Sequence, residues 1–230
     1  MRKLLMLSLL SLFSMFAYSQ TEWTCKALSD DITKWNEIYK PLASKNKKAA
    51  LALSNVFGVN KSGKLSVDYV ILCNDSIGEA KIMNAVEAWI GELFPNANNN
   101  LLTSNKNDNS IVIRGMTLGK VGEATDFFSY NVINATLEVE IYVKVNRVRI
   151  IMRSNQYKVV KAMDGKIVQN YTIAMSDTYP FYQQSDHKDS YAMAYINTFS
   201  KLINTSKWLV DYLNANVKEE TKSSAVGDDW

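Results

Sequence analysis

Apolar and polar residues alternate along several stretches in the middle of the chain. From 65 to 73 the odd positions carry Leu, Val, Tyr, Ile and Cys, while the even positions carry Ser, Asp, Val and Leu. Successive side chains of a strand point to opposite faces, so this pattern predicts a strand over Leu65–Cys73 with one fully apolar face. Shorter patterns predict strands over 101–104 and 110–116, joined by a polar turn.

The most regular alternation lies between 137 and 153, on either side of Asn146-Arg147. We expect a β-hairpin with these two residues as its turn. This register pairs Val143 with Ile150 and puts the apolar side chains of both strands on one face. On the other face it places Glu140 opposite Arg153, a favourable pair of opposite charges.

Glycines predict the turns of the second half of the chain. Asp164-Gly165 is typical of a tight hairpin turn and separates two further predicted strands, 157–163 and 166–175. Gly115, Gly119 and Gly122 lie near the end of the strand at 110–116 and beyond it, and we expect an irregular loop there.

Helical periodicity appears directly after the first strand and again near the end of the chain. Ser76 and Glu79 have the spacing of a capping box, which predicts a helix with Ser76 as its N-cap. Its apolar stripe consists of Ile82, Met83, Val86, Trp89, Ile90 and Leu93. A second, longer helix is predicted from about Ser190 to Asn214.

These elements predict an α+β fold, a curved antiparallel sheet with helices packed on one face and a long C-terminal helix. Residues 20–60 are expected to form a helical extension, in which Ser29 or Asp30 caps a helix carrying Trp35 on its apolar stripe. The main domain is then expected over 61–216. The charged tail, 217–230, is expected to be disordered.

Three of these segments also carry a resemblance to a known family. The strand at 65–73, the helix at 76–94 with Ala88-Trp89-Ile90, and the hairpin at 136–153 with Val148-Arg149-Ile150 resemble an exported bacterial family of unknown function, number 4468, with a TBP-like fold. The resemblance covers about residues 60–160. It implies a fold and an exported protein, and it implies no activity or catalytic residue.

The first nineteen residues have the form of a secretory signal peptide. Arg2 and Lys3 precede an uncharged apolar run over 4–16, and Ala17-Tyr18-Ser19 supplies small residues at the cleavage positions. The run is shorter than the roughly 20 residues that a membrane-spanning helix needs, and no later run approaches that length. We therefore expect a protein exported to the periplasm or the extracellular space, without a transmembrane segment after removal of the signal.

Signal removal also changes the charge balance. Loss of Arg2 and Lys3 lowers the formal net charge from +3 to +1. Proteins that bind nucleic acid neutralise its phosphates with a basic surface, which a nearly neutral chain does not offer overall. We therefore expect no nucleic-acid partner, whatever the name of the fold suggests.

The chain has two cysteines, Cys25 and Cys73. Export permits a disulfide between them. Cys73 also stands at an inward-facing strand position, where a thiol can serve as a small apolar side chain. Both readings are open.

Candidate catalytic residues are few. His187 is the only histidine and stands beside Asp186, which suits a general base of a hydrolase; a polar loop residue before a helix would look the same. No G-x-S-x-G motif accompanies it. One histidine and two widely spaced cysteines do not provide a zinc site, and no glycine-rich phosphate loop precedes a helix, so we expect neither a metal nor a cofactor.

Aromatic residues gather before and within the start of the last helix: Tyr179, Phe181, Tyr182, Tyr191 and Tyr195. They could line a binding surface together with the concave side of the sheet, or pack a loop onto the helix. Our first hypothesis is a non-enzymatic module that binds a small molecule or an envelope protein. The alternatives are a hydrolase using His187 and a structural envelope component that docks through residues 20–60.

Overall fold

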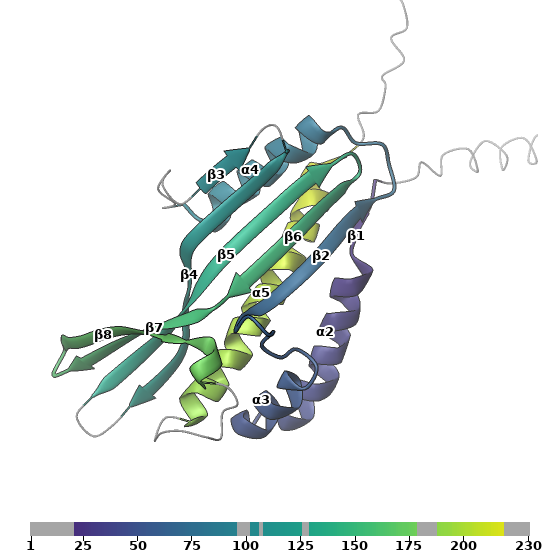
Figure 1. Ribbon diagram of the computed structural model, residues 1–230. Helices are drawn as coiled ribbons and strands as arrows, with labels where there is room; N and C mark the ends of the chain where they lie inside the picture. The colour runs from purple at the N-terminus through teal and green to yellow at the C-terminus, as the bar shows by residue number, and fades with distance from the viewer. Residues whose placement is uncertain (1–20, 96–101, 106–107, 126–128, 179–187, 219–230) are drawn as a thin grey trace, which may run out of the picture.

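The computed structural model describes residues 21–95, 102–105, 108–125, 129–178 and 188–218 (Figure 1). Within them the chain forms an α+β fold. The strands are β1 Trp23–Thr24, β2 Leu65–Cys73, β3 Leu102–Asn105, β4 Ser110–Thr125, β5 Tyr130–Lys144, β6 Arg147–Ser154, β7 Gln156–Met163 and β8 Lys166–Ala174. The α-helices are α2 Lys26–Tyr39, α3 Asn46–Ser54, α4 Glu79–Leu93 and α5 Lys188–Asn216, and short 3₁₀ turns occupy Lys40–Leu42 and Met175–Thr178.

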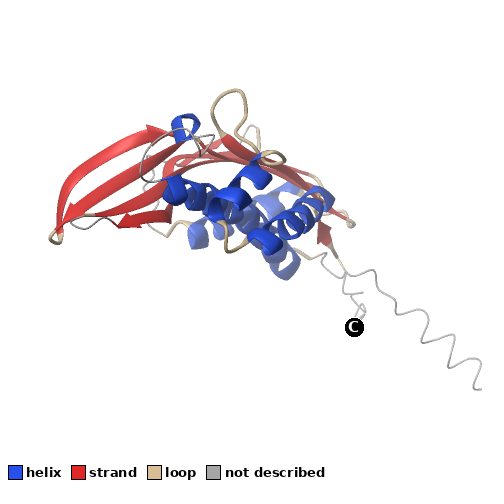
Figure 2. Cartoon of the chain, turned by 90° about the horizontal axis from the view of Figure 1, so that it is seen from below, coloured by secondary structure: helices blue, strands red, loops and turns tan. Residues whose placement is uncertain are grey.

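All eight strands belong to one antiparallel sheet. Its main part has the order β1-β2-β6-β5-β4-β3, and β7 pairs with β5 and with β8. The strand β5 changes its neighbour along its length: Glu138–Lys144 pair with β6, whereas Tyr130–Ala135 pair with β7. The outer ends of β4 and β5 thus form, with β7 and β8, an arm that extends beyond the helices (Figures 1 and 2).

The helices cover one face of the main sheet, as Figure 2 shows. The predicted strand Leu65–Cys73 is confirmed with the same bounds, and its odd positions Leu65, Val67, Tyr69 and Ile71 are buried beneath the helices. Helix α5 runs along the middle of this layer and buries Leu202, Leu209 and Leu213. The predicted layout, with helices on one face of a curved antiparallel sheet and a long C-terminal helix, is confirmed.

Residues 21–60 are built into the same core rather than standing apart from it. The Trp35 ring of α2 stacks on the Phe199 ring of α5 with their centroids 5.1 Å apart, and Phe57 lies 4.5 Å from Phe199. The helix begins at Lys26, before both predicted caps. The aromatic side chains of this segment therefore pack against α5 within the molecule.

The β5–β6 hairpin forms, but its register differs by two residues from the predicted one. Val143 pairs with Val148 instead of Ile150, and the turn is Val145-Asn146. Asn146 has a φ of 61°, a left-handed conformation that asparagine adopts more readily than arginine. A shift of two residues leaves every side chain on its original face, so the sequence pattern is satisfied equally by both registers.

The glycine-rich stretch after 116 is part of a strand, which corrects the predicted loop. Strand β4 runs on to Thr125, and its pairing with β5 is interrupted by register shifts at 113–116, 117–120 and 120–122. Gly115 and Gly119 have φ values of 74° and 72°. Glycine adopts such angles without strain and is typical of a β-bulge, which bends a strand without ending it.

The start of α4 also differs from the prediction. Its N-cap is Gly78, not Ser76, and no side chain caps the helix. Glu79 is the first helical residue, and its carboxylate accepts hydrogen bonds from Asn109 Nδ2 at 2.6 Å and from the Val145 N–H at 3.3 Å. The carboxylate therefore ties the helix to the ends of β4 and β5.

The second hairpin is confirmed at the arm. Asp164 and Gly165 form its turn with φ values of 50° and 75°, and β7 and β8 flank it. At the other end of the chain, Val217 is fully buried and its carbonyl accepts a hydrogen bond from Trp23 Nε1. The predicted tail therefore begins after residue 217; residues 219–230, like the predicted signal peptide, lie outside the described part.

Candidate functional site

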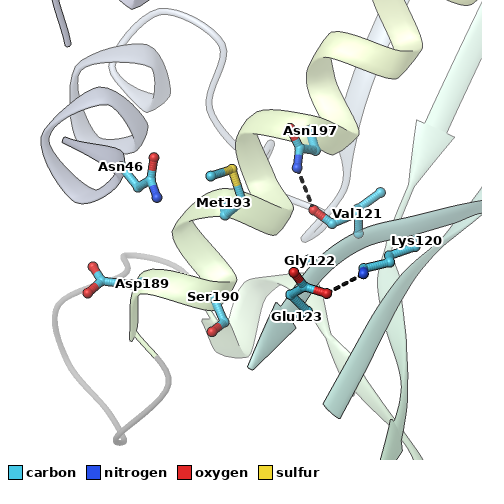
Figure 3. A pocket seen from close by; sticks show the side chains of 9 residues that line it. All are labelled: Asn46, Lys120, Val121, Gly122, Glu123, Asp189, Ser190, Met193 and Asn197. Carbon is cyan, nitrogen blue, oxygen red and sulfur yellow. Dashed lines mark hydrogen bonds and ion pairs between the residues drawn. The ribbon is translucent and has the colours of Figure 1, made fainter. Parts of the chain in front are cut away.

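A pocket of about 470 Å³ lies at the start of α5, between this helix, the start of α3 and the outer part of β4 (Figure 3). Three segments that are distant in the sequence form its walls. The lining residues are Asn46, Lys120, Val121, Gly122, Glu123, Asp189, Ser190, Met193 and Asn197.

The wall between β4 and α5 is fixed by close contact. A Cβ placed on Gly122 would lie 2.9 Å from the Ser190 carbonyl oxygen and 3.1 Å from Ala194 Cβ, so only glycine fits this approach without a shift. Beside it, Asn197 Nδ2 donates a 2.7 Å hydrogen bond to the Val121 carbonyl. The strand is thereby held against the helix at the pocket.

Lys201, one turn further along α5, secures the bulged part of β4. Its Nζ donates to the carbonyls of Leu118 at 2.6 Å and Lys120 at 3.0 Å. Burial lowers the pKa of Lys201, because the charged ammonium loses contact with water. The lysine thus joins α5 to two carbonyls in the bulged part of β4.

Both signs of charge line the pocket. Lys120 donates to Glu123 and, at 2.8 Å, to the Tyr130 hydroxyl, which in turn donates to Glu123 at 2.5 Å. These hydrogen bonds raise the pKa of Lys120 and lower that of Glu123. On the opposite side Asp189 faces Lys47 across 3.4 Å, with 72% of the aspartate side chain exposed.

The predicted aromatic cluster does not line this pocket in the part that the structure describes. Tyr195 is fully buried and donates a 2.7 Å hydrogen bond to the Phe57 carbonyl. Tyr191 packs its ring 6.0 Å from that of Tyr157, and burial raises its pKa. These two tyrosines pack the helix onto its surroundings, which is the second of the two interpretations. Tyr179, Phe181, Tyr182 and His187 lie outside the described residues.

The structure holds both Cys25 and Cys73 as free thiols, without the disulfide that export would permit. Cys25 is buried, and burial raises the pKa of its thiol. Cys73 of β2 is the pairing partner of Trp23 in β1, and Cys25 follows Trp23 by two residues. The two cysteines therefore lie in neighbouring segments, offset by two residues. The disulfide therefore stays one of the two interpretations that the sequence leaves open.

The potential metal ligands in the described part of the chain do not cluster. There, no three side chains of His, Cys, Asp or Glu come close enough to hold an ion. None of its helices is both long enough and apolar enough to cross a membrane.

The sequence pattern pointed to the start of the last helix, where the pocket lies, but to other side chains than those that line the pocket. The pocket uses Asp189, Ser190 and Met193, which alternate along α5 with the buried Ala192 and Ala194. The partners on α3 and β4 carried no motif. The glycine at 122 was the available signal, because a glycine inside a strand often marks a close approach of another segment.

None of the family models or curated proteins compared with this chain matches it. Two solved structures are similar to it. One is a TBP-like protein from Parabacteroides distasonis, 17% identical, with a TM-score of 0.48, covering 70% of this chain and 97% of that chain. The other is a DUF4468 family protein from Bacteroides ovatus, 10% identical, with a TM-score of 0.38, covering 74% of this chain and 98% of that chain.

Both descriptions agree with the family that the sequence resembles. At these identities and TM-scores, neither structure transfers an activity or a binding residue to this chain. The function therefore has to be inferred from the pocket.

Proposed function

We propose that this protein is an exported, non-enzymatic binding module of the cell envelope, working in the periplasm or outside the cell. The pocket at the start of α5 carries the binding part of the proposal, because about 470 Å³ falls within the range of small-molecule sites. The export part rests on the signal-like residues 1–19 of the sequence.

The lining favours a small polar ligand with both donor and acceptor groups. Glu123 and Asp189 offer carboxylate oxygens, Lys120 offers an ammonium group, and Met193 supplies the apolar part of the wall. Lys120 and Glu123 are already paired with each other. A ligand that binds them therefore replaces this ion pair by its own interactions with the ammonium and the carboxylate. A zwitterion, such as a free amino acid, fits this arrangement.

Native mass spectrometry of protein purified from the envelope of its host tests the proposal. We expect a small molecule to accompany the unaltered chain and to be absent from a Met193→Trp variant, whose larger side chain fills the pocket. Met163→Trp is the matched control, because Met163 is 38% exposed beside the β7–β8 turn and does not line the pocket. Equal retention of the ligand in both variants would contradict the assignment of the pocket.

The alternative, a hydrolase that uses His187, can be tested with the same protein preparation. If the protein has a hydrolase activity that disappears in a His187→Ala variant, the protein is an enzyme and the binding-module proposal is rejected. Loss of the ligand in Met193→Trp without any such activity would support the binding module.

A further inference from the structure

A second pocket opens on the face of the sheet that the helices leave bare. It has a volume of about 290 Å³ and is lined by Val70, Tyr142, Lys144, Arg147 and Arg149. Their neighbours along the strands, such as Ile71, Val143 and Val148, are buried on the opposite face beneath the helices. The five side chains therefore belong to the open face, away from the pocket at α5.

Strand pairing arranges this site in two rows across β2, β6 and β5. Arg147 is the pairing partner of both Leu72 and Lys144, and Arg149 is the partner of both Val70 and Tyr142. Each row thus has an apolar residue on β2 and an arginine in the middle. Two cations, Arg147 and Lys144, stand directly opposite each other in the first row.

The carboxylates of the open face are already occupied. Arg149 is bound through two hydrogen bonds by Asp68, at 2.9 and 2.6 Å. Arg153 and Lys64 bind the two glutamates of β5, Glu140 at 2.6 Å and Glu138 at 3.1 Å.

Within the described residues, neither Arg147 nor Lys144 has an acidic partner. Like charges at directly opposed strand positions repel each other and destabilise the pairing. An anion bound between them would remove that repulsion. The unmatched pair is therefore a feature that points to a ligand.

Apolar surface lies beside the unmatched cations. Val70 and Leu72 are 44% and 51% exposed, and Val145, next to Lys144 in the turn, is 48% exposed. A ligand that fits both features has an anionic head and an apolar body. The planar fork of an arginine matches the two oxygens of a carboxylate, and the lysine adds a second positive charge.

We propose that this open-face pocket binds a small aliphatic carboxylate. Its head lies between Arg147 and Lys144, and its chain lies along Val70 and Leu72. The site is separate from the one in the proposed function and does not depend on it.

Titration of octanoate into the purified exported protein at low salt, followed by calorimetry, tests the proposal. We expect saturable binding that is about tenfold or more tighter than that of acetate, because only the longer chain reaches the apolar residues. Inorganic phosphate, which has the charge and no apolar body, should bind no better than acetate. Equal affinities for octanoate and acetate would overturn the proposal.

The double variant Lys144→Gln/Arg147→Gln should weaken octanoate binding about tenfold or more, since both charges that hold the head are gone. The control is Lys34→Gln/Lys40→Gln, which removes the same charge from exposed positions in α2 and in the 3₁₀ turn that follows it, and should leave binding unchanged. Equal weakening in both double variants would show a general charge effect and reject the site. If the first variant fails to fold, the octanoate-to-acetate ratio of the unaltered protein decides.

Vesicles separate a free carboxylate from a lipid surface. Phosphatidylglycerol vesicles present anionic heads whose chains are buried in the bilayer, so the exported protein should not sediment with them. Sedimentation with these vesicles together with no octanoate binding would overturn the proposal in favour of a membrane surface.

Discussion

Asn214 forms two hydrogen bonds with the backbone of Trp23, a residue 191 positions earlier in the chain. Its Oδ1 accepts from the Trp23 N–H and its Nδ2 donates to the Trp23 carbonyl, both at 2.8 Å. The side chain of the last helix therefore satisfies the backbone of the first strand on the edge that β2 does not cover. This contact joins the two ends of the described chain.

Replacing Asn214 by alanine should lower the free energy of unfolding by about 1–3 kcal/mol, because a backbone N–H and C=O lose their partner at a part-buried position. Denaturant unfolding followed by tryptophan fluorescence measures the change. Asn216→Ala is the control, since its side chain only donates to the Tyr212 carbonyl at an exposed site. Equal effects of the two substitutions would show that the contact with Trp23 contributes nothing.

Gly122→Ala should destabilise the protein by about 1–3 kcal/mol, because the new Cβ meets the Ser190 carbonyl at 2.9 Å and β4 has to move from α5. Gly91→Ala in α4 has nothing within 4 Å of its Cβ and should instead stabilise by about 0.5–1 kcal/mol. Thermal unfolding of both variants checks the opposite signs. A stabilised Gly122→Ala variant would disprove the close approach.

Acid should weaken the sheet through Glu140. Its hydrogen bond from Arg153 holds the pKa of the carboxyl below the usual value of 4.5. A carboxylate with a lowered pKa stabilises the fold above its ordinary pKa, and this contribution is lost as the pH falls through the lowered value. Glu140→Gln should therefore reduce the loss of stability between pH 7 and pH 3.

Unfolding by denaturant at the two pH values measures this difference. Glu37→Gln, at an exposed position of α2, is the control and should leave the difference as large as in the unaltered protein. If Glu140→Gln behaves like this control, the ion pair does not contribute to the acid sensitivity.

The edge strand β8 should govern self-association at high concentration. Of the strands in the described residues only β7 pairs with it, and Ile167 and Val168 are 70% and 53% exposed. An exposed apolar edge is a template for pairing with another chain, and a lysine placed there interferes. Val168→Lys should therefore lower the association seen by light scattering without changing the melting temperature; Val145→Lys, at a turn, should not lower it.

Local sequence patterns predicted the individual strands and turns better than the register in which the strands pair. The strand 65–73 and the Asp164-Gly165 turn follow from periodicity and turn chemistry alone, which act over a few residues. The β5–β6 register does not, because patterns of period two are unchanged by a shift of two. Here Asn146, whose φ is positive, decides the turn.

The candidate site was harder to predict for a related reason. Aromatic residues such as Tyr191 and Tyr195 are typical of binding surfaces. In the structure these two side chains pack against neighbouring segments instead. The pocket residues Asn46 and Glu123 come from segments whose meeting depends on the bend in β4. Gly122 is a local signal that another segment comes close to β4, but it does not identify that segment.

Because β5 pairs with β6 over one part of its length and with β7 over the other, the arm can differ in length without a change in the main sheet. Near the point where β5 changes its neighbour, Thr136 Oγ1 lies 2.9 Å from Asn155 Oδ1, where β6 passes into β7. Lengthening β7 and β8 by matched pairs of residues at the Asp164-Gly165 tip would keep the facing of every side chain and leave the helix-covered sheet untouched. The tip is therefore the place where an affinity tag or a reporter could be inserted into this protein.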